Sequence, residues 1–473
     1  MRVAILSSEA VPFAKTGGLA DVAGALPKAL RENGEEAWLV LPLFEQIDRR
    51  HLREQIIDNL DVDWRGRPYR ARVWYSDATS APSFLIDAPE YFARNSIYGF
   101  RDDHERFAFF CRASLALFKR LGAPPDIVHL NDWPGGFAAA ELRSRRPFDP
   151  YYARTRTLFS IHNLAYQGGF DPGDLWVLGF GEDERDAFMM DGAASALKAG
   201  LMSSDWLSTV SRRYALEIQT PEFGHGLEWI LRARSDHLAG ITNGVDYDVW
   251  NPATDPHLPA HFDINNMNGK RACKLDLLRG FGLPEDLDRP IIANISRLTS
   301  QKGYDLIKEA GWAILETGAF FVALGSGASE YEDFLQWMRD HAPRQVGIFK
   351  GFNEPLAHRI EAGADIFLMP SLFEPCGLNQ MYSTRYGTVP VVRATGGLDD
   401  TVEDFDRVRG TGNGFKFGPY TASAMLDKIY EALYCYAEPE VWRTIQLNGM
   451  RVDNSWRAAA QKYVQLYRRV VQM

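Results

Sequence analysis

The sequence has few cysteines, no long apolar run and no excess of basic residues. Its four cysteines, Cys111, Cys273, Cys376 and Cys435, show no paired spacing, so neither a disulfide framework nor a cysteine zinc site is indicated, and a reduced compartment is the default. No apolar stretch approaches the length needed to span a bilayer, and the one at the start is too short for a signal peptide, so we expect a cytoplasmic protein. The net charge of −10 argues against nucleic acid or an anionic membrane as the main partner.

Motifs that identify several enzyme classes are also missing. The chain has no Ser-His-Asp order, no H-E-x-x-H motif and no cluster of metal ligands, so we expect neither a hydrolytic triad nor a bound metal. The main Asp-x-Asp candidate, Asp61-Val62-Asp63, is expected to lie in a solvated loop. Gly325-Ser326-Gly327 resembles half of a dinucleotide fingerprint, but Glu330 would repel a pyrophosphate there, so an ordinary strand-to-helix turn is favoured. We therefore expect no cofactor.

The sequence does contain a regular alternation of strands and helices. Short apolar strands recur along the chain, each followed by a polar loop and a helical pattern, which predicts parallel, doubly wound α/β sheets. A chain of 473 residues is expected to form two such domains. Turn residues at 245–252 mark a boundary, so the predicted domains are residues 1–244 and 245–455, and an amphipathic helix is predicted over 456–473.

The most informative stretch runs from Phe373 to Gln380 and reads FEPCGLNQ. It lies between an apolar strand at 365–370 and a predicted helix that follows it, and ligands of open α/β sheets bind at such loops. Glu374 supplies a carboxylate, Gly377 lets the backbone approach a ligand, and the helix N-terminus supplies N–H groups, which together suit a polyhydroxyl ligand or an anion. A solvated carboxylate in an ordinary turn is the alternative.

Two other loops of the second predicted domain strengthen that interpretation. A glycine turn, Thr395-Gly396-Gly397, follows the strand at 389–392, so two adjacent strand ends are expected to present backbone amides side by side. Arg297 and Lys302 lie in the loop after another strand, and two cations five residues apart can clamp a diphosphate. The alternative for this pair is a solvated helix start.

Strands of the first predicted domain also end in polar residues. Lys15 precedes the pair Gly17 and Gly18, which is expected to form a tight turn at a helix start, where the backbone could approach a phosphate or a sugar. A later strand-like run ends in the same way at Asn243.

Two further strand ends carry titratable candidates. Asp132 is either an acid-base group or the cap of the next helix. His162, followed by Asn163, is either a catalytic base or a structural histidine. Nearby aromatic residues could stack on a sugar, although core packing is the favoured interpretation for Trp133, Tyr166 and Phe170.

Taken together, these residues resemble the bacterial glycogen and plant starch synthases, which are retaining glucosyltransferases. The resemblance covers almost the whole chain and is most specific in KTGGLADV at residues 15–22, in SRLTSQKG at 296–303, and in the loops at 374–380 and 395–398. Many related transferases carry a second glutamate eight positions after the first, and Tyr382 stands there in this chain, as in the synthase subgroup. Residues 45–100 resemble the family least.

The resemblance implies a fold of the GT-B type, with two Rossmann-like doubly wound domains facing across a deep cleft and the last helix packing back on the first domain. The first domain would serve the acceptor side, and the second would bind the nucleotide sugar. The implied reaction transfers glucose from ADP-glucose to the 4-hydroxyl at the non-reducing end of an α-1,4-glucan such as glycogen, with retention of configuration. Because no opposite-face nucleophile is obvious, the resemblance favours a same-face route in which the departing phosphate takes the acceptor proton.

The resemblance also implies roles for individual residues. Arg297 and Lys302 would neutralise the ADP leaving group, Glu374 would bind glucose hydroxyls, and His162 would border the reaction centre; these four are the implied catalytic residues. The implied donor-binding set contains Lys15, Gly17, Gly18, Asp132, Asn163, Asn243, Arg297, Lys302, Glu374, Cys376, Gly377, Leu378, Thr395, Gly396 and Gly397.

Three other classes of protein remain as alternatives. A glucan phosphorylase would need a lysine bound to pyridoxal phosphate, and a nucleotide-sugar oxidoreductase would need NAD and a complete glycine fingerprint. A catalytically inactive glucan-binding protein would not need Arg297, Lys302 and Glu374 together, so their joint presence argues against it.

Overall fold

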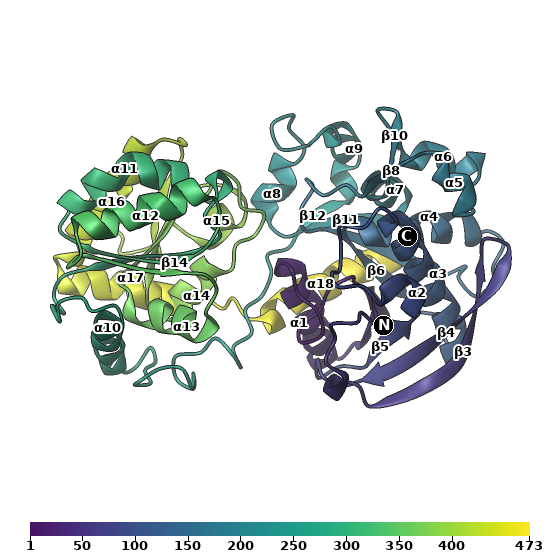
Figure 1. Ribbon diagram of the computed structural model, residues 1–473, viewed down its shortest axis with the longest axis horizontal. Coiled ribbons are helices and arrows are strands. Elements are labelled where there is room, and N and C mark those ends of the chain that lie inside the picture. Colours follow the sequence, from purple (N-terminus) through teal and green to yellow (C-terminus); the bar gives the residue numbers. More distant parts are fainter. The chain divides into compact units, whose positions relative to one another are not determined.

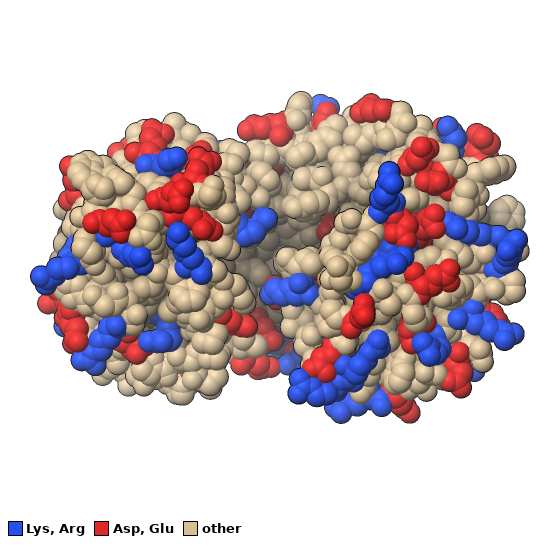
Figure 2. Space-filling model, viewed as in Figure 1, with Lys and Arg blue, Asp and Glu red and all other residues tan.

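The computed structural model describes residues 1–473, which divide into two compact units (Figure 1). Unit 1 comprises Met1–Gly244 with Trp456–Met473, and unit 2 comprises Val245–Ser455. None of the helices is both long enough and apolar enough to cross a membrane. Figure 2 shows acidic and basic side chains intermixed over the visible face of each unit.

Unit 1 contains a nine-stranded sheet with the order β12-β11-β7-β6-β1-β2-β5-β4-β3. Its strands are β1 (Arg2–Leu6), β2 (Glu36–Pro42), β3 (Glu54–Trp64), β4 (Arg67–Ser76), β5 (Ser83–Asp87), β6 (Ile127–Asn131), β7 (Arg156–Ile161), β11 (Trp206–Thr209) and β12 (Leu238–Gly240). The strands from β12 to β5 run parallel, and β4 and β3 extend the sheet antiparallel. Because the order reverses between β1 and β6, this is the topological switch point, where ligands of such sheets bind.

Asp61 and Asp63 lie in β3, so the expectation of a solvated loop is wrong. Residues in this part of β3 alternate between exposed and buried, with both aspartates exposed and Val62 buried between them. This two-residue period is what places one face of a strand against the core and the other toward solvent. Arg70 on β4 lies 3.6 Å from Asp61, so that carboxylate has a cross-strand partner.

Unit 1 contains ten helices. They are α1 (Gly18–Glu32), α2 (Pro89–Phe92), α3 (Asp103–Leu121), α4 (Asp132–Arg145), α5 (Asp174–Val177), α6 (Glu182–Phe188), α7 (Ala196–Ser203), α8 (Arg212–Glu217), α9 (Glu228–Ala233) and α18 (Trp456–Val471). A small antiparallel sheet is formed by β8 (Gly169–Phe170), β9 (Met189–Met190) and β10 (Ala193–Ser195). Short 3₁₀ turns occur at Arg49–His51 and Ser235–His237.

The terminal helix α18 docks on unit 1 through a buried polar chain. It packs against α1 and β7, and its Tyr467 hydroxyl is hydrogen-bonded to Nδ1 of His129 at 2.7 Å. Nε2 of His129 lies 2.6 Å from the hydroxyl of Ser160 on β7. Burial lowers the pKa of His129 to about 3, so the imidazole is neutral and uses one nitrogen as donor and the other as acceptor.

Unit 2 contains six parallel strands in the order β15-β14-β13-β16-β17-β18. They are β13 (Ile291–Ile295), β14 (Phe320–Gly325), β15 (Val346–Lys350), β16 (Ile366–Met369), β17 (Val389–Arg393) and β18 (Phe415–Phe417). Counted within the unit, this is the order 3-2-1-4-5-6 of a Rossmann sheet, and its switch point lies between β13 and β16.

Helices cover both faces of the unit 2 sheet. Figure 1 shows α11, α12 and α16 on one face, and α10, α13 and α14 on the other. The helices are α10 (Asn268–Gly280), α11 (Tyr304–Glu316), α12 (Ser329–His341), α13 (Glu354–Gly363), α14 (Asn379–Arg385), α15 (Gly396–Thr401), α16 (Ala422–Tyr436) and α17 (Pro439–Arg451), with a 3₁₀ turn at Ser300–Lys302. The predicted α/β class, with doubly wound sheets, is therefore confirmed.

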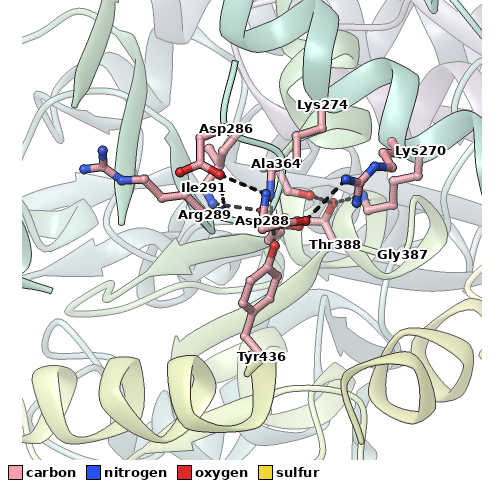
Figure 3. A network of polar contacts seen from close by, with 12 residues as sticks. Lys270, Lys274, Asp286, Asp288, Arg289, Ile291, Ala364, Gly387, Thr388 and Tyr436 are labelled. Carbon is pink, nitrogen blue, oxygen red and sulfur yellow. Dashed lines mark hydrogen bonds and ion pairs between the residues drawn. The ribbon is translucent and has the colours of Figure 1, made fainter. Parts of the chain in front are cut away.

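A buried polar network fastens α10 to this sheet (Figure 3). Lys270 donates three hydrogen bonds of 2.7–3.0 Å, to oxygens of Ala362, Tyr386 and Thr388. Lys274, one turn further on, pairs with Asp365 at 2.7 Å, and the same carboxylate oxygen accepts the N–H of Ile291 at 2.9 Å. Burial lowers the pKa of Lys270 to about 8, and its three acceptors compensate for the water that the ammonium has lost.

Candidate functional site

The candidate residues of each unit lie at the carboxyl edge of its sheet. In unit 2 most of them follow β13, β16 and β17, which are neighbouring strands. In unit 1 most of them follow β1, β6 and β7, which are also neighbours. In both sheets the switch point falls among these loops, where ligand sites of doubly wound sheets occur. Residues far apart in the sequence are thus gathered on one edge of each sheet.

The unit 2 set is centred on an ion pair across the switch point. Lys302 lies in the 3₁₀ turn after β13, and Glu374 lies in the loop after β16. Lys302 Nζ is 2.5 Å from Glu374 Oε2, and the hydroxyl of Ser371 donates to the same oxygen at 3.2 Å. The Glu374 side chain is 8% exposed and that of Lys302 19%, so both charges are largely shielded from water. A cation and a carboxylate that could bind a diphosphate and sugar hydroxyls therefore start out bound to each other.

Arg297 lies on the same loop as Lys302, with an exposed side chain. The turn after β14 shapes this loop, because the N–H of Leu298 donates to the carbonyl oxygen of Ser326 at 2.9 Å. A Cβ at Gly325 would lie 1.9 Å from the carbonyl oxygen of Ser296, so only glycine permits this approach. The Gly325 turn is an ordinary strand-to-helix turn, as predicted, and it supports the Arg297 loop.

The glycine turn after β17 packs directly against the Glu374 loop. The N–H of Gly397 donates to the carbonyl oxygen of Glu374 at 3.1 Å. A Cβ at Gly396 would lie 1.9 Å from that same oxygen, and one at Gly397 would lie 1.9 Å from the carbonyl oxygen of Cys376. The expectation that this turn presents its amides to a ligand is wrong for Gly397, because the neighbouring loop uses that N–H. The glycines after Thr395 instead allow two loops to meet backbone to backbone.

Gln380 fixes the other end of the Glu374 loop, and sequence reasoning gave it no role. Its Nε2 donates to the carbonyl oxygens of Cys376 and Gly377, each at 3.1 Å. Gly377 has φ of +70°, a conformation that favours glycine, and a Cβ there would lie 2.6 Å from Gln380 Oε1. Leu378 then precedes the first residue of α14. In the sequence, this role could have been inferred from the position of Gln380, whose amide side chain stands three residues after Gly377.

In unit 1 a buried carboxylate that sequence reasoning missed holds the loop after β1. Glu9 Oε2 accepts the N–H groups of Thr16 at 2.5 Å and Gly17 at 3.1 Å. The hydroxyl of Tyr98 donates to Glu9 Oε1 at 2.8 Å. In the sequence, this role could have been inferred from the position of Glu9, which comes soon after the end of β1 and eight residues before Gly17.

Lys15 and the glycine pair lie on this same loop. Lys15 is exposed and pairs with Asp21 at 2.7 Å. Gly17 is extended, with φ of −150°, and Gly18 begins α1, so the expected tight turn is replaced by an extended entry into the helix. A Cβ on either glycine would have no heavy atom within 4 Å, so open space adjoins both.

Asp132 and His162 meet at the carboxyl ends of β6 and β7. Asp132 Oδ1 accepts the backbone N–H groups of His162 at 2.7 Å and Asn163 at 3.4 Å. Asp132 is itself the first residue of α4, with φ of +51°, so the helix-cap alternative is wrong. His162 Nε2 donates to Asn131 Oδ1 at 2.9 Å, because the Asn131 amide nitrogen already donates to the carbonyl oxygen of Leu6.

Burial shifts both titratable groups toward their neutral forms. It raises the pKa of Asp132 to about 7, against two backbone hydrogen bonds that favour the charged carboxylate. It lowers the pKa of His162 to about 4, so the imidazole is neutral at physiological pH. His162 can therefore act as a hydrogen-bonding group or a base, but not as a resident cation.

The remaining unit 1 candidates are spread out. Asn243 follows β12, and its side-chain oxygen has no hydrogen-bond partner within the chain. The aromatic platform does not form, because Phe170 is buried in a cluster of phenylalanines and Tyr166 is 61% exposed. Trp133 packs edge-on against Phe107, with ring centroids 4.9 Å apart. Core packing is thus confirmed for Phe170 and wrong for Tyr166.

Comparisons with known proteins match most of the chain. Residues 2–233 match the family model described as starch synthase catalytic domain, and residues 281–445 match the one described as glycosyl transferases group 1. A glycogen synthase from Anaeromyxobacter dehalogenans (strain 2CP-C) is 47% identical over 478 residues, which cover 99% of each chain. A glycogen synthase from Syntrophotalea carbinolica is 42% identical over 484 residues, covering 100% of this chain and 99% of its relative.

Solved structures share the fold over the whole chain. The catalytic domain of starch synthase IV from Arabidopsis thaliana, bound to ADP and acarbose, matches with a TM-score of 0.90 and 33% identity, covering 100% of this chain and 99% of that one. A sucrose-phosphate synthase from Thermosynechococcus elongatus matches with a TM-score of 0.62 at 18% identity, covers 99% of both chains, and shows the same fold. The predicted GT-B type of fold is confirmed. The chain is a glycosyltransferase and belongs to the glycogen synthase family.

Proposed function

We propose that this glycosyltransferase elongates an α-1,4-glucan, transferring glucose from ADP-glucose to the 4-hydroxyl at a non-reducing end with retention of configuration. The observation that carries the proposal is the Lys302–Glu374 pair at the switch point of unit 2, with Arg297 on the same loop. Full-length similarity to glycogen synthases, and to a starch synthase bound to ADP and acarbose, supports the donor and the acceptor. The cytoplasmic location expected from the sequence is part of this proposal.

The leaving group explains why a cation must stand beside a carboxylate. Departure of ADP develops negative charge on the diphosphate, and Lys302 and Arg297 neutralise it in place of a metal ion. When the donor binds, the Lys302 ammonium turns to the diphosphate and Glu374 accepts hydrogen bonds from the glucose hydroxyls. In this exchange the Lys302–Glu374 ion pair is replaced by contacts of Lys302 with the diphosphate and of Glu374 with the glucose. Because the pair is already largely shielded from water, charge stabilisation there is stronger than in bulk solvent.

Unit 1 supplies hydrogen-bonding groups in this proposal. His162, Asn163 and Asn243 contact the sugar, while the loop of Lys15, Gly17 and Gly18 approaches the diphosphate through its open space. Two carboxyl groups, those of buried Glu9 and half-buried Asp132, act as positioning groups, since they hold the backbone of the loops that bear these residues. The residues of this proposed set are divided between unit 1 and unit 2.

An assay with ADP-glucose and UDP-glucose side by side tests the proposal, with glycogen as acceptor and EDTA in excess. We expect incorporation of glucose from ADP-glucose that EDTA does not reduce, because fixed cations stabilise the leaving group. Digestion of the product by an α-1,4-specific amylase checks retention of configuration. A requirement for magnesium or manganese would contradict this account of the leaving group. Release of glucose 1-phosphate from glycogen and phosphate, without transfer from ADP-glucose, would identify a phosphorylase instead.

A further inference from the structure

Two tryptophan rings lie side by side on the surface of unit 2, on helices that carry none of the site residues. Trp312 of α11 is 56% exposed and Trp337 of α12 is 37% exposed. Their ring centroids are 5.5 Å apart and their planes are inclined by 43°. His341, one turn after Trp337, adds a third ring 4.5 Å from Trp337. Figure 1 shows α11 and α12 together on one face of the unit 2 sheet. Trp312, Trp337 and His341 are called the Trp312 patch below.

The fold leaves much of both indoles outside its core, although the Trp337 ring stacks on the core residue Phe334 with centroids 6.0 Å apart. The hydrophobic cluster beneath the two helices contains Ile307, Phe334 and Met338, and neither tryptophan belongs to it. The indole of tryptophan is the largest aromatic side chain. When its apolar surface stays in contact with water, the protein does not gain the free energy that burial of this surface would contribute. Two exposed aromatic residues that touch each other are therefore a candidate ligand surface.

Polar side chains border the Trp312 patch. Lys308, one turn before Trp312, lies 3.4 Å from Glu330 on the facing helix. Beside Trp337 on α12, Gln336 Nε2 donates to Asp340 Oδ1 at 2.6 Å. His341 Nδ1 donates to the carbonyl oxygen of Trp337 at 2.9 Å, which leaves Nε2 as an acceptor. Aromatic faces with hydrogen-bonding groups at their rim suit a sugar, whose ring has apolar C–H faces and hydroxyl groups at its edge.

Size and charge favour a small neutral ligand over the other classes of partner. The exposed parts of the two indoles amount to on the order of 200 Å², whereas a stable protein interface buries about 800 Å² on each side. Both signs of charge occur at the rim, and its carboxylates, which include Glu330 and Asp340, oppose a polyanion such as nucleic acid. A neutral ligand one or two sugar rings wide matches both the small exposed area of the indoles and the carboxylates beside them.

We propose that the Trp312 patch is a second binding site for the α-1,4-glucan, one that holds a glucan chain on unit 2 outside the transfer site. The inference rests on the proposed function for the identity of this ligand. Successive glucose rings of an α-1,4-glucan are inclined to each other, because the axial bond at C1 bends the chain. Two indoles inclined by 43° can each face one of two successive rings, whereas the flat chain of a β-1,4-glucan cannot meet both. A polymer tethered in this way returns its chain ends to the enzyme at a raised local concentration.

Retardation of the full chain in native gels that contain glycogen measures this binding. The double variant Trp312→Ala/Trp337→Ala should bind glycogen about tenfold more weakly than the wild type, a loss of about 1.4 kcal/mol. The variant Trp312→Phe/Trp337→Phe keeps two stacking faces and should recover most of the affinity. Trp229→Ala is the matched control, because Trp229 on α9 is 52% exposed and belongs to no such pair. Added maltoheptaose should release the wild type from glycogen, while a cello-oligosaccharide of equal length should not.

Turnover with maltotriose separates this site from the transfer site. A short acceptor does not span two sites, so its kcat and KM should be the same in the wild type and in the double alanine variant. Equal retardation of these two proteins, or an equal loss in Trp229→Ala, would overturn the inference. So would unchanged glycogen binding with an altered oligomeric state in ultracentrifugation, which would make the patch an interface between copies. If the wild type failed to use ADP-glucose but its retardation still depended on both indoles, the proposed function would fail and this inference would stand.

Discussion

The polar loops of the two sheets are held by different interactions, and the difference distinguishes residues that fix a loop from residues that can bind a ligand. In unit 1, side-chain oxygens of Glu9 and Asp132 accept backbone N–H groups and thereby fix the path of the chain. In unit 2, glycines bring the loops together backbone to backbone, and the carboxylate of Glu374 is bound by the side chain of Lys302. A carboxylate that holds several amides is costly to release, whereas one that holds a flexible lysine can be exchanged for a substrate. We therefore propose a positioning role for the unit 1 carboxylates and ligand binding for Glu374.

Lys302→Gln gives the largest effect expected from this comparison. The glutamine keeps a hydrogen-bonding group near Glu374 but removes the cation that we propose stabilises the leaving diphosphate. The kcat with ADP-glucose should fall by roughly two to three orders of magnitude, the scale for loss of one preorganised charge stabiliser. Lys350→Gln is the control, because Lys350 is also in unit 2 and lies 3.9 Å from a glutamate, but away from the switch point. A folded Lys302 variant with kcat within tenfold of the wild type would refute the proposal that Lys302 leaves Glu374 to bind the diphosphate.

Glu9→Gln tests the positioning side of the comparison and should have a smaller effect. The amide oxygen can still accept from Thr16 or Gly17, but a charged acceptor binds N–H groups more strongly than a neutral one. The loop should loosen, and KM for ADP-glucose should rise about tenfold, since hydrogen bonds to charged groups contribute about 1.5–3 kcal/mol. The kcat at saturating donor should change less than KM does. An unchanged KM would show that this loop does not touch the donor.

The sequence predicted the kind of sheet and the strand ends, but not the partners of the side chains. Apolar runs followed by polar residues located the loops after β13, β16 and β17, because parallel strands of doubly wound sheets end at one edge. The Lys302–Glu374 contact joins residues 72 positions apart and depends on which strands are neighbours, which periodicity does not give. The role of Asp132 stayed open between an acid-base group and a helix cap, because a cap and a carboxylate that holds a neighbouring loop look the same in a sequence.

Asp132→Asn should change stability in a pH-dependent way. Burial raises the pKa of Asp132 from 3.8 to about 7, so the folded protein keeps a proton that the unfolded chain releases. Stability from this group is present below about pH 4 and is lost as the pH rises through about 7. Asparagine cannot ionise and still accepts from His162, so the variant should match the wild type near pH 4 and melt several degrees higher near pH 8. Parallel melting-temperature profiles would refute a buried, titrating Asp132, and Asp63→Asn on the exposed face of β3 is the control.

Cys376→Ser should have the smallest effect, although its residue adjoins Glu374. Two contacts of Cys376 that shape the loop come from its main chain, because its carbonyl oxygen accepts from Gln380 and faces Gly397. Serine leaves that backbone in place, so kcat should stay within about threefold of the wild type, a change of about 0.7 kcal/mol in activation free energy. A bulky maleimide should inactivate the wild type by filling the loop and should spare the serine variant.

All four cysteines are buried, so the serine variant also serves as the control for modification elsewhere in the chain. Inactivation of both proteins by the reagent would place the sensitive thiol at another position and leave the kcat of Cys376→Ser as the deciding measurement. If that kcat fell as far as in Lys302→Gln, the sulfur would take part in the chemistry. The loop would then hold a second reactive group beside Glu374. In that case Cys376 would act through its side chain as well as its backbone, and Glu374 would not be the only side chain of this loop with a chemical role.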